Sequence, residues 1–80
     1  MIAEVFIELK KGVMDAEGEA VKKALRLLGF KKVKGVSSVK VYRIEIDTNS
    51  KEEAEREVRE MCEKLLANPV IQNYRIVLKE

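Results

Sequence analysis

The stretch that decides the fold is FKKVKGVSSVKVYRIEI, residues 30–46, because it can form one long strand or two short ones. Its apolar residues follow an extended pattern whose parity changes between Val41 and Tyr42, which indicates a bulge or a change of buried face. An unbroken strand over residues 33–46 would span about 46 Å at roughly 3.3 Å per residue. A compact domain of this length is only about 30 Å across, from a radius of gyration of about 12 Å. We therefore expect the segment to break near residues 35–38, to project and pair with another subunit, or to do both.

Upstream of this stretch, the sequence predicts a strand followed by a helix. Residues 2–9, IAEVFIEL, alternate between two faces in the manner of a half-buried strand. Asp15 is well placed to cap the helix, because its carboxylate can accept hydrogen bonds from backbone N–H groups two or three residues on. The helix is expected to end at Gly29, which suits a left-handed C-terminal cap. One apolar stripe at helical spacing comprises Val21, Ala24, Leu25 and Leu28.

Downstream, the sequence predicts a second helix and a final strand. Ser50 with Glu53 three residues on makes a capping box at the start of the helix. Asn68 precedes Pro69 and is pushed out of helical geometry, which ends the helix. The segment YRIVL, residues 74–78, then forms a strand. The apolar stripe of this helix comprises Ala54, Val58, Met61, Cys62, Leu65 and Leu66.

These elements predict a single domain over residues 1–80 of the α+β class, with two amphipathic helices on one face of a mostly antiparallel sheet. If the middle segment forms two strands, the order is the βαββαβ order of ferredoxin-like folds. The other face of the sheet carries Phe6 with few other large groups and needs a partner or solvent. A chain this short buries only about 60–65% of its unfolded surface. We therefore expect the sheet to extend across a dimer.

Composition excludes several classes of protein. The chain has 16 basic and 14 acidic residues, a net charge of +2, which argues against a dedicated nucleic-acid binder. Its apolar runs are too short for a transmembrane helix, and its first residues lack the pattern of a signal peptide. A cytoplasmic protein without membrane contact is the expectation. One cysteine rules out an internal disulfide and cannot by itself assemble a zinc site.

Cys62 and the two aspartates are the catalytic candidates of the sequence. A reactive cysteine needs a base or electropositive surroundings, but the chain has no histidine and Cys62 lies on an apolar stripe far from a helix N-terminus. We predict that it is a small core residue. Asp15 and Asp47 could form a carboxylate pair, but each precedes a helix, where capping and turn roles are favoured.

The binding candidates of the sequence are a glycine-flanked segment and a cluster of lysines. The segment KKGVMDAEG lacks the spacing of a phosphate-binding loop. A basic cluster around the middle segment could contact RNA or an acidic partner, but no aromatic stacking platform accompanies it. A solvated edge that resists sheet aggregation is the favoured role. We predict no catalytic, cofactor-binding or metal-binding residues. The cluster comprises Lys31, Lys32, Lys34 and Lys40.

Three strings together resemble one known family, PurS, the small subunit of phosphoribosylformylglycinamidine (FGAM) synthase. They are LKKGVMDAEGEAVKKAL at 9–25, LGFKKVKGV at 28–36 and, most specific, MCEKLLANPVIQNYRI at 61–76. The resemblance covers essentially the whole chain. It departs from the family pattern at Lys11 and Ala16, where prolines are usual, and at Val39, where glycine is usual. The missing prolines imply a less rigid first loop.

The resemblance implies a non-catalytic structural subunit of an ATP-dependent amidoligase of purine biosynthesis. In that family a PurQ subunit releases ammonia from glutamine, and a PurL subunit uses ATP and magnesium to convert formylglycinamide ribonucleotide (FGAR) to FGAM. PurS bridges the two and supports ammonia transfer. PurL and PurQ are thus the implied partners, with self-association as a homodimer or, alternatively, a tetramer. The competing interpretation is a ferredoxin-like regulatory module that binds RNA or a small ligand.

Overall fold

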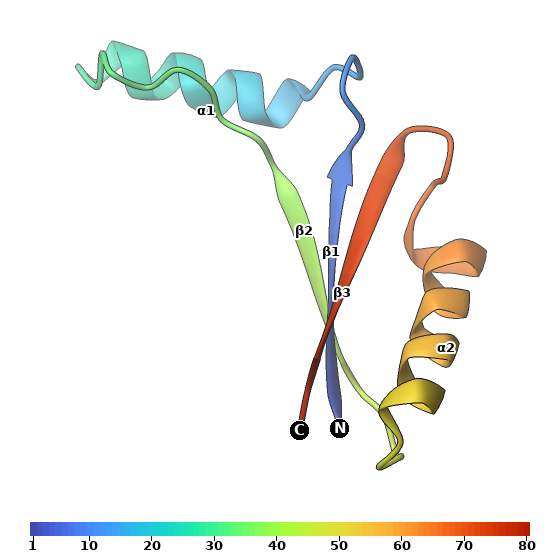
Figure 1. Cartoon of the computed structure of the whole chain (residues 1–80). Coiled ribbons are helices and arrows are strands. Elements are labelled where there is room, and N and C mark those ends of the chain that lie inside the picture. The colour runs from blue at the N-terminus through green and yellow to red at the C-terminus, as the bar shows by residue number, and fades with distance from the viewer.

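The fold is an antiparallel sheet with one helix packed on it and a second helix that extends beyond its end (Figure 1). The computed structural model describes all 80 residues of the chain. Asp15 caps the first helix through Gly18 N at 2.9 Å, and Ser50 caps the second through Glu53 N at 3.2 Å, as predicted. The elements are β1 (Ile2–Leu9), α1 (Ala16–Leu27), β2 (Val39–Glu45), α2 (Lys51–Met61), a π-helical turn η1 (Cys62–Leu66) and β3 (Gln72–Lys79).

The sheet has three strands in the order β2-β1-β3, and β1 is antiparallel to both neighbours. The middle segment therefore supplies one strand only, so neither the unbroken long strand nor the pair of short strands forms. The reason is the length of β1. Its residue Glu8 pairs with Val39, and after Leu9 the chain turns away, so residues 33–38 have no strand in this chain to pair with. The order is therefore βαβαβ, without the second middle strand on which the βαββαβ order depended.

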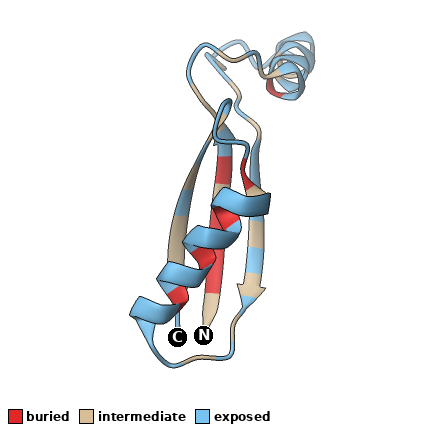
Figure 2. Cartoon of the chain, turned by 90° about the vertical axis from the view of Figure 1, so that its right-hand side faces the viewer, coloured by how far each residue is buried: buried red, intermediate tan, exposed pale blue.

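The core lies between α2 and one face of the sheet. Ala54, Val58 and Cys62 project from α2 and η1, and all three are fully buried. Figure 2 shows the buried positions along the inner side of this helix and along β1. The helix ends as predicted, because Ala67 adopts an extended conformation (φ −122°, ψ 141°) just before Asn68 and Pro69. The sheet contributes Ala3, Val5 and Ile7, with Tyr42, Ile44, Tyr74, Ile76 and Leu78 partly buried around them.

Helix α1 does not pack on the sheet, which corrects the prediction that both helices cover one face. It extends away from the end of the sheet, and residues 28–38 return alongside it (Figure 1). Because β1 and β2 are adjacent and antiparallel, their connection has no need to cross the sheet. The extents of the chain are 48 × 27 × 14 Å and its radius of gyration is 16.0 Å. A compact chain of this length would have about 12 Å.

The two termini lie together at the other end of the sheet (Figure 1). Ile2 pairs with Lys79 across β1 and β3, and the backbone of Met1 exchanges hydrogen bonds with Ile46. Neither helix has the length and apolar character that crossing a membrane requires. The fold thus has a sheet body with the termini at one end and, at the other, an arm formed by residues 10–38.

Candidate interaction surfaces

The base of the arm is held by the carboxylate of Asp15. Its Oδ1 accepts hydrogen bonds from Gly18 N at 2.9 Å and Ser38 Oγ at 2.8 Å, and its Oδ2 accepts one from Ser38 N at 2.7 Å. The bonds from Ser38 and Gly18 hold the pKa of Asp15 below its usual range, because they stabilise the charged form. Asp47 follows β2 at the opposite end of the sheet, so the two aspartates form no carboxylate pair. Asp15 therefore has a structural role.

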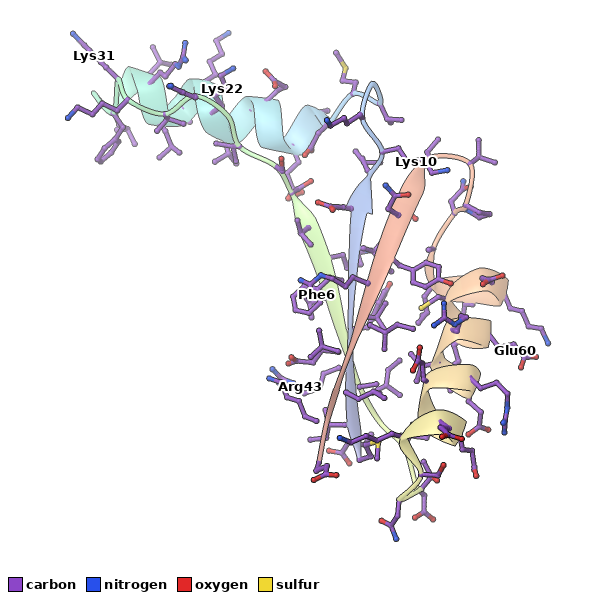
Figure 3. The ribbon with its side chains drawn as sticks, in the orientation of Figure 1. Phe6, Lys10, Lys22, Lys31, Arg43 and Glu60 are labelled. Atoms are coloured by element: carbon purple, nitrogen blue, oxygen red, sulfur yellow. The ribbon has the colours of Figure 1, made fainter.

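The outer part of the arm is basic and carries exposed apolar groups. Between residues 16 and 38 there are six bases and two acids, a net charge of +4, so the rest of the chain carries −2. Leu27 is 80% exposed and Phe30 is 58% exposed. The guanidinium of Arg26 donates to Val33 O at 2.9 Å, which ties the returning segment to α1. Figure 3 shows Lys22 and Lys31 pointing outward from this region.

The predicted lysine cluster is divided by the fold. Lys31, Lys32 and Lys34 lie on the arm, whereas Lys40 lies on the edge strand β2 with its ammonium 5.7 Å from the centre of the Tyr42 ring. All four are exposed. The predicted role of a solvated strand edge therefore applies to Lys40, while the other three belong to the basic surface of the arm.

The sheet face opposite α2 is not covered by any element of the chain. Arg75 stacks on Phe6, with its guanidinium carbon 4.3 Å from the ring centre, and Val41 is nearly half exposed beside it. Figure 3 shows Phe6 and Arg43 on the side of the sheet away from α2. The predicted unpartnered face of Phe6 is therefore confirmed for the isolated chain. It combines an apolar centre with charges of both signs.

Glu4 organises the charges on this open face. Its Oε1 lies 2.9 Å from the ammonium of Lys79, and its Oε2 lies 3.2 Å from the guanidinium of Arg43. The pKa of Glu4 is lowered, first by the hydrogen bond from Lys79 and then by that from Arg43. Both cations are more than half exposed, so water screens these pairs. The two ion pairs of Glu4 therefore contribute little to the stability of the fold, and their main effect is to hold the side chains of the open face in place.

Cys62 lies in the core, as predicted, and is fully buried. Burial raises the pKa of its thiol, because it disfavours the thiolate. No group of three or more histidine, cysteine, aspartate or glutamate residues in the chain could hold a metal ion. These observations describe a packed side chain in which burial outweighs the opposing effect of Arg59 on the pKa of the thiol.

Two hollows flank the base of the arm. One, of about 440 Å³, is lined by Glu8, Glu17 and Lys40 among others. The other, of about 430 Å³, also contains Glu8 and has Lys10 and Asp15 in its wall. Each hollow is lined by charges of both signs, so neither selects a cationic or an anionic small ligand. The exposed surfaces that remain as candidate sites are the arm and the open sheet face.

Comparison with known proteins identifies the family of the chain. The family model PurS, described as phosphoribosylformylglycinamidine (FGAM) synthase, matches residues 2–80. The chain belongs to the PurS family. The resemblance of the strings at 9–25, 28–36 and 61–76 is therefore confirmed over essentially the whole chain.

Individual PurS proteins agree with this assignment in sequence and in structure. The PurS subunit of Archaeoglobus fulgidus is 72% identical over 80 residues, which are all of both chains. The crystal structure of Methanocaldococcus jannaschii PurS is similar with a TM-score of 0.89 and 47% identity, covering 99% of this chain and 95% of that chain. A chain of the PurLQS structure from Thermotoga maritima matches with a TM-score of 0.82 and 29% identity, covering 96% of both chains.

Two features of this chain are not evident from its sequence. Gly18 ends the segment KKGVMDAEG in the sequence, and in the structure it lies in α1 against the returning segment and is buried. A glycine in the first helical turns, followed by a good apolar stripe, is the signal that could have indicated a close approach. The ion pairs of Glu4 were also missed, because cross-strand neighbours depend on strand order.

Proposed function

We propose that this chain is a non-catalytic structural subunit of FGAM synthase that holds the PurQ glutaminase and the PurL synthetase together. The observation that carries the proposal is the match over 96% of the chain to a chain of the Thermotoga maritima PurLQS structure. In the proposed assembly, glutamine, ATP, water and FGAR give glutamate, ADP, phosphate and FGAM. In this role the chain holds the PurQ and PurL active sites at a fixed relative position, so that ammonia passes between them without escaping to solvent.

The proposal places all chemistry, ATP and magnesium on the partner subunits. It is supported by the state of Cys62, the only thiol, which is fully buried and has no histidine to activate it. It is also supported by the arm-base hollows, whose mixed charges offer no convergent site for a nucleotide phosphate. The cytoplasmic location expected from the sequence is part of the same proposal.

Self-association as a homodimer is a second part of the proposal, with a tetramer as the alternative. The apolar stripe of α1 supports it, because Val21 is 43% exposed and Leu28 is 74% exposed. The edge position of β2 supports extension of the sheet across a dimer, since one side of this strand is unpaired. Only nine residues of the 80 are buried in the isolated chain, so a second copy would supply missing core. Light scattering at micromolar concentration that gives a stable monomer would overturn this part.

The assembly role is tested by reconstitution with purified PurL and PurQ. We expect glutamine-dependent formation of FGAM to require the chain, because separated subunits lose ammonia to solvent. Ammonia-dependent formation by PurL should require it much less. Omission of PurQ is the control for glutamine dependence. Glutamine-dependent rates that are equal with and without the chain would contradict the proposal.

The alternative function is a regulatory module that binds RNA or a small ligand. The observation that favours it is the net charge of +4 on residues 16–38, together with exposed Phe30. This alternative expects nucleic acid to co-purify with the chain, or a ligand to raise its unfolding temperature, in the absence of PurL and PurQ. The absorbance ratio at 260 and 280 nm after low-salt purification, together with the unfolding temperature with and without added ligand, separates the two proposals.

A further inference from the structure

The direction of the arm must be set at its base. Helix α1 lies beyond the sheet, and the arm joins the body only through residues 10–15 and through Ser38 at the start of β2 (Figure 1). The returning segment is tied to the outer end of α1 by Arg26, whose guanidinium donates to Val33 O. This tie joins one part of the arm to another and leaves the angle between arm and sheet undetermined. Within one chain, the contacts at the base are therefore the ones that determine that angle.

The base contacts form a clasp made of Asp15, Gly18, Val36 and Ser38. Both carboxylate oxygens of Asp15 are used, with Oδ1 accepting from Gly18 N and Ser38 Oγ and Oδ2 accepting from Ser38 N. One side chain thus connects the first turn of α1 to the residue that precedes β2, 23 positions further along the chain. Since β2 is paired with β1, this connection relates α1 to the sheet itself.

Gly18 allows the clasp to close. A Cβ atom at this position would overlap the carbonyl oxygen of Val36 and would lie 2.7 Å from Asp15 Oδ2. The first of these is a backbone atom, so the returning segment would have to move away from the helix. Glycine is among the least favourable residues inside a helix, and helix formation does not explain its presence. Close approach of the returning segment does.

We infer that Asp15, Gly18 and Ser38 are positioning residues, which set the direction of the α1 arm and thereby the surface that the chain offers to its assembly. The consequence for activity rests on the proposed function, whereas the consequence for arm direction does not. A helix of this length is about 18 Å long, so a tilt of about 10° at the base moves its outer end by about 3 Å. Packed interfaces do not absorb a displacement of that size without loss of contacts.

The direction of the arm is measured by pulsed electron paramagnetic resonance. Nitroxides are attached at Leu27→Cys on the arm and Glu57→Cys on α2, and the labelled chain is diluted with unlabelled chain to suppress distances between copies. Cys62 is fully buried and does not compete for the label. For the parent chain we expect one narrow distribution of distances between the two nitroxides. In Gly18→Ala we expect this distribution to shift or broaden by about 3 Å or more, which is the displacement of the outer end of α1 for a tilt of about 10°.

Matched variants separate the clasp from general effects of substitution. Gly35→Ala is the glycine control, because nothing lies within 4 Å of a Cβ at that position, and its distribution should equal that of the parent. Ser38→Thr keeps both donors and should also behave as the parent, whereas Asp15→Ala should broaden the distribution. If Gly18→Ala does not fold, the distance distribution of Asp15→Ala is compared with that of the parent instead. Unchanged distributions in the clasp variants would overturn the inference.

The effect on assembly is measured by titrating each chain into PurL and PurQ. If the open clasp leaves the arm correctly directed about one tenth of the time, the half-maximal chain concentration rises about tenfold. The ammonia-dependent rate should not change, because the proposed function places that reaction on PurL alone. If the parent chain does not stimulate glutamine-dependent formation of FGAM, the proposed function is contradicted. The distance measurement then still shows whether the clasp sets the direction of the arm. A Gly18→Ala chain that titrates as the parent overturns the positioning role in assembly.

Discussion

One valine from each of the two apolar stripes gives a direct test of where the core lies. Val58 on α2 is fully buried, whereas Val21 on α1 is 43% exposed. The substitutions Val58→Ala and Val21→Ala remove the same atoms from the same kind of element. Any difference between them in the free energy of unfolding therefore reports burial.

The expected cost of Val58→Ala follows from its burial. Removing two buried carbons loses about 1.6 kcal/mol at about 0.8 kcal/mol each. A residual cavity of roughly 40 Å³ adds about 1 kcal/mol at about 24 cal/mol per Å³. The better helix propensity of alanine offsets roughly 0.5 kcal/mol, which leaves a loss of about 2 kcal/mol. For a domain of this size that lowers the unfolding temperature by roughly 8–16 °C.

The expected cost of Val21→Ala in the isolated chain is much smaller. About half of the transfer free energy is lost, roughly 0.8 kcal/mol, and most of it is offset by helix propensity, so the net change is about 0.3 kcal/mol. Urea unfolding followed by circular dichroism at several chain concentrations measures both variants. If a second copy covers the arm, the cost of Val21→Ala should grow with concentration. Equal losses for the two variants at the lowest concentration would refute the placement of α1 outside the core.

Three further predictions concern single side chains. Cys62 should not react with iodoacetamide in the folded chain and should react fully in urea; rapid labelling without denaturant would show that the thiol is accessible. The lowered pKa of Glu4 contributes stability that is present above the usual carboxyl range and is lost as pH falls through the folded value. Between pH 7 and pH 3 the unfolding temperature of Glu4→Gln should therefore fall less than that of the parent, and parallel losses would contradict this. Tyr74→Phe removes a hydrogen bond of 2.9 Å to Glu63, so we expect a loss of about 1 kcal/mol in urea unfolding, and a stabilised variant would show that the bond is not formed in solution.

Local features of the fold were predictable because they depend on neighbours in sequence. Alternation identified β1, and the caps at Asp15 and Ser50 were placed correctly, as was the left-handed Gly29 with its φ of +101°. The apolar position of Cys62 on a helical stripe was enough to assign it to the core. In each case the physical cause acts within a few residues.

Long-range features were not predictable, because they depend on contacts between residues that are far apart in the sequence. An apolar stripe shows that a helix needs a cover, but it does not show whether the cover belongs to the same chain, so α1 was placed on the wrong surface. The break of the middle segment near residues 35–38 was predicted correctly, because β2 begins at Val39, but the absence of a second short strand before it depends on the end of β1 at Leu9. The role of Asp15 as a cap was found, but its bonds to Ser38 depend on a contact across 23 residues.

The adjacency of the two termini has a practical consequence for engineering the chain. Met1 and Glu80 flank a paired end of the sheet, on the far side of the body from the arm. A tag or a fused subunit at either terminus should therefore leave the arm free. A short linker joining the termini would also permit a circular permutant opened at exposed Gly35. In such a permutant the returning segment becomes a chain end, while the strand register and the contacts of Asp15 with Ser38 are retained.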